Sequence, residues 1–151
     1  MLDSIDKRIL RALQRNAKQT NAELAQEVGL SATPCSRRVQ LLEKQGVIAG
    51  YVAMLNPAAV ELKFMAFVRI TLERQDKTTV ERFAREMEAA PEVLECHLMA
   101  GSYDYLLRVV ARDLDDYQRF QMETLTKIDG VRNVVTEIPL RSVKQTSRLP
   151  I

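Results

Sequence analysis

A set of hydrogen-bonding side chains between residues 33 and 44 has the spacing of one helical face. Hydroxyl, amide and cationic groups of this kind bond to phosphate oxygens and base edges; an Arg suits guanine and a Gln suits adenine. The chemistry that this face favours is binding of duplex DNA, and the alternative is a helical hairpin whose basic face is only solvated. The set recurs at intervals of three and four residues and comprises Thr33, Ser36, Arg37, Gln40 and Lys44.

Three further polar residues extend this candidate DNA-binding set. Asn21 begins the preceding helix, Ser31 begins the helix itself, and Arg38 follows Arg37. We therefore expect contacts with double-stranded DNA from these eight positions, on a helix running from Ser31 to Lys44.

Residues that could support other chemistry are few and scattered. Cys35 and Cys96 have no metal-ligand spacing, and His97 stands on a predicted strand without a Ser, Cys or carboxylate at a telling distance. We expect no catalytic residue, no metal and no cofactor. Cys35 is expected to be a small core residue, with a thiol-sensing role as the alternative.

The elements that position the polar face form a helix-turn-helix over residues 21–46. Leu24, Ala25 and Val28 share one face of the first helix, which Asn21 caps and Gly29 ends. In the second helix, the inner stripe is Cys35, Val39 and Leu42; Ser31 or Thr33 caps it, Pro34 fits its first turn and Gly46 closes it. An earlier helix over residues 2–14, capped by Asp3 or Ser4, completes a three-helix core.

After Gly46 the chain is rich in β-forming residues, and we expect a small wing or connecting strand that ends at Asn56-Pro57. We predict a winged helix-turn-helix domain over residues 1–50 and a linker strand over 51–62. The positive charge lies in this half, because residues 1–60 contain eight Lys/Arg and five Asp/Glu, against fourteen and fifteen in residues 61–151.

From residue 63 onward the hydrophobic period alternates between two and 3.6. Strands are expected over residues 64–73, 93–99, 104–111 and 131–143, with helices capped by Asp76 and Asp113. The order is β-α-β-β-α-β, so residues 63–151 are predicted to form a ferredoxin-like domain with both helices on one face of an antiparallel sheet. The whole chain is of the α+β class.

The other face of this sheet has no helix to cover it, and we expect a second copy of the chain to do so. Coverage by Lys and Arg stems is the alternative. The candidates for this apolar face are Met65, Phe67, Leu94, Cys96, Leu98, Leu107, Val109, Val134 and Ile138.

The complete pattern resembles the Lrp/AsnC (leucine-responsive, feast/famine) family of transcription factors. The residues that carry the resemblance are LDSIDKRILRALQRNAKQTNAELAQEVGLSATPCSRRVQLLEKQGVIAGYVAMLNP, then PEVLECHLMAGSYDYLLRVVARD and the closing VKQTSRLPI. The resemblance implies a DNA-binding regulator whose homodimers assemble into tetramers, octamers or larger rings. It also implies an amino-acid effector bound between dimers, with Thr146 and Ser147 near subunit contacts.

The family's effector loop matches Gly101, Ser102, Tyr103, Asp104 and Tyr105. A turn at Gly101 exposes N–H groups suited to a carboxylate, and Asp104 offers the opposite charge for an ammonium group. A simple β-hairpin turn is the structural alternative. Cys35 and Met99 suggest cysteine or another sulfur-containing or apolar amino acid as effector.

Two other functions remain as rivals of an amino-acid-responsive regulator. One is an architectural DNA-binding protein without a ligand, and the other is a small enzyme built on the ferredoxin-like half. No apolar run reaches the ~20 residues of a membrane span, so no membrane partner is expected. We expect a cytoplasmic, nucleoid-associated protein.

Overall fold

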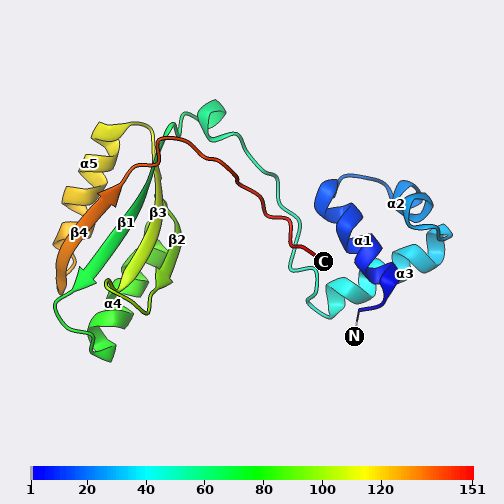
Figure 1. Cartoon of the computed structure of the whole chain (residues 1–151), viewed down its shortest axis with the longest axis horizontal. Helices are drawn as coiled ribbons and strands as arrows, with labels where there is room; N and C mark the ends of the chain where they lie inside the picture. The colour runs from blue at the N-terminus through cyan, green and yellow to red at the C-terminus, as the bar shows by residue number, and fades with distance from the viewer. Residues whose placement is uncertain (1) are drawn as a thin grey trace. The chain divides into compact units, whose positions relative to one another are not determined.

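The computed structural model describes residues 2–151 and divides the chain into two compact units (Figure 1). The first unit extends to Met54 and includes Val143–Ile151; the second spans Leu55–Ser142. By its contacts the closing segment groups with the helical unit, and the domain boundary expected at residues 63–151 stays a prediction. It is held there by Gln14, whose amide nitrogen donates to the carbonyl of Leu149 (3.2 Å) while its oxygen accepts from the Leu149 N–H (2.6 Å).

The first unit contains three helices whose ends follow local capping chemistry. Asp3 caps α1 (Ser4–Arg15), and Thr20 caps α2 (Asn21–Val28), each within a capping box. The expectation that Asn21 caps α2 is wrong, because Asn21 is already the first helical residue. Gly29 ends α2 in the left-handed conformation (φ 72°), as its position predicts.

Helix α3 (Ala32–Lys44) begins after Ser31 and ends before Gly46, whose φ is 71°. Ser31 is the N-cap by its backbone conformation, although its side chain makes no capping hydrogen bond. The apolar stripes of the three helices meet in one core that contains Ile9, Leu10, Ala12, Leu24, Ala25, Val28, Cys35 and Leu42.

The expected wing or linker strand does not form in the described residues. Residues 47–56 are irregular, and the only regular element between α3 and the first strand is a 3₁₀ turn, Pro57–Val60. Tyr51, Val52 and Met54 are exposed. β-forming residues need a neighbouring strand to pair with, and this part of the chain has none.

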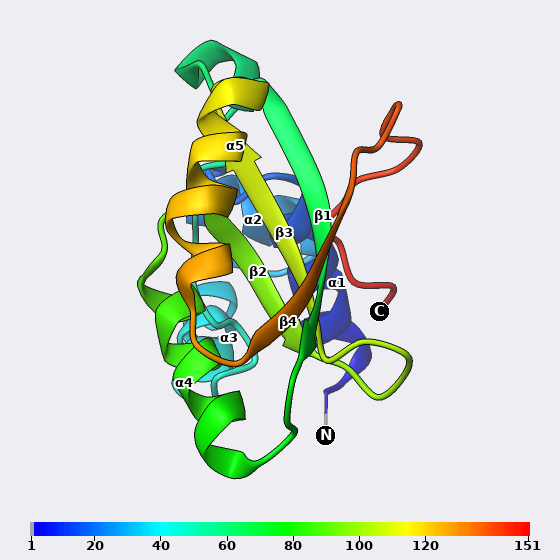
Figure 2. The same cartoon turned by 90° about the vertical axis from the view of Figure 1, so that its left-hand side faces the viewer.

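The second unit is the predicted β-α-β-β-α-β domain. Its four-stranded antiparallel sheet has the order β2-β3-β1-β4, and both long helices lie on one face (Figure 2). The strands are β1 (Phe64–Leu72), β2 (Val93–Leu98), β3 (Tyr105–Ala111) and β4 (Val131–Glu137); the helices are α4 (Lys77–Ala89), α5 (Leu114–Glu123) and the short 3₁₀ turn Leu125–Lys127. The last strand is shorter than the expected 131–143.

The register shows which strand residues face the helices. Val68 lies opposite Leu107, and Ala66 lies opposite Val109; all four are fully buried beneath the helices. The prediction that Leu107 and Val109 belong to the uncovered face is therefore wrong: Arg108 between them marks that face, and the apolar Leu106 and Val110 beside it blur the alternation.

Five further members of that list also lie elsewhere. Cys96 and Val134 pack against the helix-covered core, and Leu94 and Leu98 line a groove between β2 and α4. Ile138 follows the end of β4. Met65 and Phe67 do lie on the uncovered face, which they share with Leu106, Val110 and Val135.

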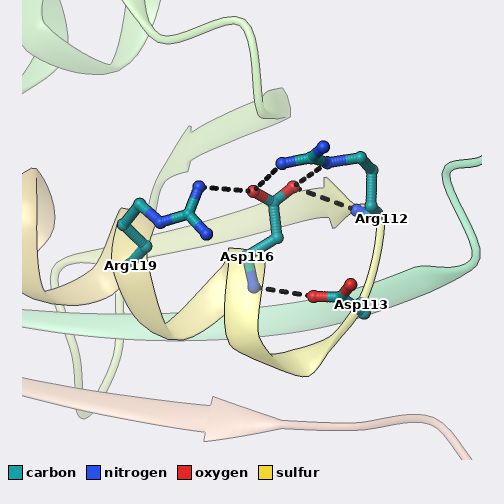
Figure 3. Close-up of polar contacts among 4 residues, drawn as sticks. All are labelled: Arg112, Asp113, Asp116 and Arg119. Atoms are coloured by element: carbon teal, nitrogen blue, oxygen red, sulfur yellow. Dashed lines mark hydrogen bonds and ion pairs between the residues drawn. The ribbon is translucent and has the colours of Figure 1, made fainter.

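The first turn of α5 is tied to the end of β3 by a carboxylate between two arginines (Figure 3). Asp113 caps the helix by accepting from the Asp116 N–H (2.8 Å). Asp116 in turn accepts from Arg112 through its backbone (3.2 Å) and its guanidinium (2.9 Å), and from Arg119 (3.3 Å). These donors, those of Arg112 foremost, lower the pKa of Asp116 to about 2.

Within residues 2–151, no helix has the length and apolar character needed to cross a bilayer.

Candidate DNA interface and effector loop

Helix α3 presents the polar stripe on its outer side. Cys35 and Leu42 point into the three-helix core, and Val39 packs partly against it. Because these residues occupy one side of the helix, Thr33, Arg37, Gln40 and Lys44 are left exposed on the other. Among residues 2–151, neither Arg37 nor Lys44 takes part in an ion pair, so both charges are available to an anionic partner.

Five of the eight predicted DNA-binding residues line one shallow surface hollow. They are Asn21, Thr33, Ser36, Arg37 and Gln40, together with Ala32. Ser31 and Lys44 lie at the two ends of the same helix. A hollow lined by an amide, two hydroxyls, a guanidinium and a carboxamide offers both donors and acceptors, which is what the edges of base pairs require.

Asn21 has a second task in the folded protein. Its side-chain nitrogen donates to the carbonyl oxygen of Ala32 (2.8 Å). This bond joins the first turn of α2 to the first turn of α3. The amide oxygen and the second side-chain N–H of Asn21 remain for an outside partner.

Arg38 does not join the outer stripe. Its guanidinium donates to Asp3 (2.7 Å) and to Asp6 (2.7 Å), both at the start of α1. These two bonds raise the pKa of Arg38, and the pKa of Asp3 is lowered, first by the Asp6 N–H and then by Arg38. The charge of Arg38 is thus paired inside the domain, and its contact with DNA stays a prediction.

Cys35 is fully buried beneath α3 and unpaired. Burial raises the pKa of its thiol, which lowers the fraction of the reactive thiolate. The core role expected for Cys35 fits this environment better than thiol sensing does.

In the expected effector loop, Asp104 is directed inward. It is 5 % exposed, and its carboxylate accepts from the Leu72 N–H (2.7 Å) and from the side-chain amide of Gln75 (2.6 Å). Its backbone donates to Ile70 and accepts from Met99, both at 2.8 Å. Asp104 therefore anchors the loop to the end of β1, and the expectation that it presents a free charge to an ammonium group is corrected.

The other loop residues divide into buried and open positions. The Tyr105 hydroxyl donates to the carbonyl of Val80 (2.8 Å) beneath α4. Tyr103 is half-buried, and the guanidinium carbon of Arg69 lies 5.5 Å from its ring centre. Gly101 and Ser102 are exposed, with no atom within 4 Å of the Cβ position of Gly101, and these two form the open part of the loop.

Sequence reasoning missed three residues that hold these sites together. Asp6 pairs with Arg38, Gln75 holds Asp104, and Arg69 stacks on Tyr103. Acids in the first turn of a helix are a visible feature of the sequence, but their arginine partner lies more than thirty residues away. Arg69 and Gln75 are brought to the loop only by strand pairing.

Comparison with known proteins assigns a family to each unit. Residues 2–49 match a model described as winged helix-turn-helix DNA-binding, and residues 65–149 match one described as Lrp/AsnC ligand binding domain. The leucine-responsive regulatory protein of Haemophilus influenzae is 44% identical over 148 residues, covering 98% of this chain and 89% of the relative. The protein of that name from Escherichia coli K12 is 42% identical over 150 residues, covering 99% and 92%.

Solved structures agree over the same length. A transcriptional regulator from Neisseria meningitidis, determined as a complex with L-Met, has a TM-score of 0.95 at 38% identity and covers 99% of this chain and 97% of that one. The AsnC protein of E. coli has a TM-score of 0.89 at 26% identity, covering 98% of each chain. With an exposed, unpaired polar stripe on α3 and a matching ligand-binding domain, the chain belongs to the Lrp/AsnC family of DNA-binding transcriptional regulators.

Proposed function

We propose that this regulator changes its DNA binding in response to an α-amino acid held in the second unit. The observation that carries the proposal is the open loop at Gly101 and Ser102, in a domain whose family model is described as ligand binding. The relative from N. meningitidis was determined with L-Met, and the curated relatives are named for leucine. We therefore propose an apolar or sulfur-containing amino acid as the effector.

The structure supports a site completed by a second copy. Asp104 and Tyr105 are buried in their own subunit, so the loop alone offers the exposed backbone of Gly101 and Ser102. A ligand of this size needs enclosure on most sides. We propose homodimers that assemble further into tetramers, octamers or larger rings, with the effector bound between dimers.

The proposed mechanism is a population shift without catalysis. An effector that binds one assembly better than another favours that assembly by its differential affinity. The favoured assembly would present its α3 helices at another spacing, and dimeric readers of the major groove require half-sites about 34–36 Å apart. Because its proposed action is on DNA, we propose that the protein is cytoplasmic and associated with the nucleoid.

A ligand-independent architectural role is the second candidate. It is favoured by the engagement of Asp104 with Leu72 and Gln75, which leaves the loop without a free carboxylate. The two candidates differ in whether any amino acid changes the protein.

The deciding experiment titrates the full chain with each of the twenty amino acids by calorimetry. Each titration is paired with anisotropy on a duplex that the protein selects from a random pool and with sedimentation velocity. We expect at least one apolar or sulfur-containing amino acid to release heat and to shift both DNA affinity and sedimentation. Absence of heat and of both shifts for all twenty would establish the architectural role instead.

A further inference from the structure

One guanidinium joins helix α3 to the start of helix α1. The Nη1 atom of Arg38 lies 2.7 Å from Asp3 Oδ2 and 2.7 Å from Asp6 Oδ1. The same two carboxylates form the capping box of α1, in which the Asp6 N–H donates to Asp3 (2.8 Å) and the Asp3 N–H donates to Asp6 (3.2 Å). Arg38 is therefore bonded to the residues that define the first turn of α1.

The contact with Asp6 is partly sheltered from solvent. The Arg38 side chain is 33% exposed and that of Asp6 is 17% exposed, whereas that of Asp3 is 49% exposed. An ion pair with restricted access to water is screened less than a pair on the open surface. The ion pair of Arg38 with Asp6 can therefore help to fix the orientation of α3 relative to α1, whereas a fully exposed ion pair contributes little.

The position of Arg38 on α3 determines what the attachment controls. Cys35 and Leu42 form the buried ridge of the helix. Arg38 follows Cys35 by three residues and lies about 60° to one side of that ridge. On the other flank, Asn21 bonds the carbonyl of Ala32, three residues before Cys35. The helix is thus attached on both sides of an apolar ridge about which it could otherwise roll.

We propose that Arg38 is a positioning residue, whose bonds to Asp3 and Asp6 set the rotation of α3 so that Arg37 and Gln40 face DNA. The proposal rests on α3 being the helix that reads DNA. A roll of about 20° at a side-chain radius of about 5–6 Å moves the side-chain ends by about 2 Å. That displacement breaks hydrogen bonds to base edges, which need separations near 2.7–3.2 Å.

The role differs from a direct phosphate contact in one measurable way. Removing a carboxylate from a DNA-binding domain ordinarily leaves its DNA affinity unchanged or increases it, because phosphate repels carboxylates. If Asp6 acts through Arg38, its replacement by Asn lowers the affinity for a specific duplex. The sign of this effect separates positioning from contact.

The test is a double-mutant cycle in the full chain with Arg38→Gln, Asp6→Asn and the double variant. Binding is measured by anisotropy on a duplex that the wild type selects from a random pool and on a scrambled duplex of equal length. We expect each single variant to lower affinity for the selected duplex by about 3- to 30-fold and the double variant to lose no more than Arg38→Gln. Affinity for the scrambled duplex should change by less than about twofold, so the specificity ratio falls.

The neighbouring Arg37→Ala variant is the matched control. Arg37 is exposed and unpaired, so its loss should lower affinity for the selected duplex by about 5- to 150-fold if it reads a guanine. That loss should add independently to the loss from Asp6→Asn. Circular dichroism at the assay temperature must show that each variant is folded. If Arg38→Gln is not folded, the cycle is made with Arg38→Lys and Asp3→Asn instead.

Two results would overturn the role of Arg38. One is an Asp6→Asn variant that binds the selected duplex as tightly as wild type or more tightly. The other is an Arg38→Gln variant whose affinity is unchanged. A wild-type protein that does not distinguish the two duplexes would instead contradict sequence reading by α3, and the assigned role of Arg38 would fall with it.

Discussion

Two adjacent arginines show how far the role of a side chain depends on the helix face that it occupies. Arg37 and Arg38 are identical in chemistry and neighbours in sequence, but they lie about 100° apart around α3. Arg37 is exposed and makes no ion pair within residues 2–151, whereas Arg38 is bonded to Asp3 and Asp6. Composition and charge could place both at a DNA interface; only the packing of α1 against α3 distinguishes them.

Asp104 shows the same dependence in the second unit. Its carboxylate satisfies the backbone N–H of Leu72 at the end of β1 and the side chain of Gln75. The residue therefore has a structural task, whatever the loop binds.

At the residue scale, Asp104→Ala should lower the free energy of unfolding. The substitution leaves the Leu72 N–H buried without its acceptor, and such a loss costs about 1–3 kcal/mol. Urea unfolding, followed by far-ultraviolet circular dichroism at one protein concentration, measures it. The matched control is Glu88→Ala, an exposed carboxylate on α4 whose loss should change stability by less than about 0.5 kcal/mol. Equal stability of the wild type and Asp104→Ala would show that the loop is not anchored by this side chain.

At the element scale, helix termini are determined by short-range chemistry. Asp3, Asp76 and Asp113 were predicted as caps, with Ser4 as an alternative to Asp3, and each accepts from the third residue of its helix. Thr20 caps α2 in place of Asn21, because Thr20 and Glu23 have the spacing of a capping box and form both of its hydrogen bonds. The cap prediction therefore held at α1, α4 and α5 and failed at α2, where Asn21 was the one candidate named.

The first turn of α5 makes stability depend on pH. Asp116 has a folded-state pKa of about 2, below its ordinary value of 3.8, because Arg112 donates to its ionised form. A depressed carboxyl pKa stabilises the fold above the unfolded pKa, and this contribution is lost as the pH falls from about 4 to about 2.

We therefore expect Asp116→Asn to be less stable than wild type at pH 7, with a difference that shrinks below pH 4 and disappears near pH 2. Thermal unfolding across this range measures it. In the double variant with Arg112→Ala, the asparagine substitution should have little further effect. A stability gap that is the same at pH 7 and pH 2.5 would remove Arg112 as its cause.

At the scale of the whole molecule, the uncovered sheet face is the feature most suited to assembly. Met65, Phe67, Leu106 and Val135 lie on it outside the buried core. Two arginines of the central strands lie among them, Arg108 opposite Phe67 and Arg69 opposite Leu106. Each is paired within the subunit, Arg69 with Glu137 (2.8 Å) and Arg108 with Glu95 (2.7 Å). Protein interfaces are enriched in aromatic residues, Met and Arg, so this face suits burial against a second copy.

We expect Phe67→Asp to weaken self-association by at least about 30-fold, because a central aromatic residue contributes about 2 kcal/mol or more to an interface. Sedimentation velocity over a range of concentrations measures the change. Met122→Asp is the control, since Met122 is 69% exposed on α5, on the opposite side of the sheet. An assembly unaffected by Phe67→Asp would place the subunit contact elsewhere.

The sequence by itself determined the order of the elements, most helix caps, the outer stripe of α3 and the core stripe of β1. These depend on residues within one or two turns of each other, where periodicity and capping dominate. It also predicted a small wing or connecting strand after Gly46, a linker strand over residues 51–62 and a β4 that continues to residue 143, and the structure has none of these. A strand exists only if another strand pairs with it, and that is not a local property.

Only the tertiary structure decided which polar side chains were free. Arg38 is paired by Asp3 and Asp6, Asp104 is held by Leu72 and Gln75, and the face of Leu107 follows from its partner Val68. Each of these contacts joins residues about thirty or more positions apart. A charge or an amide has the same appearance in sequence whether its partner is water, DNA or its own chain, and folding alone selects among them.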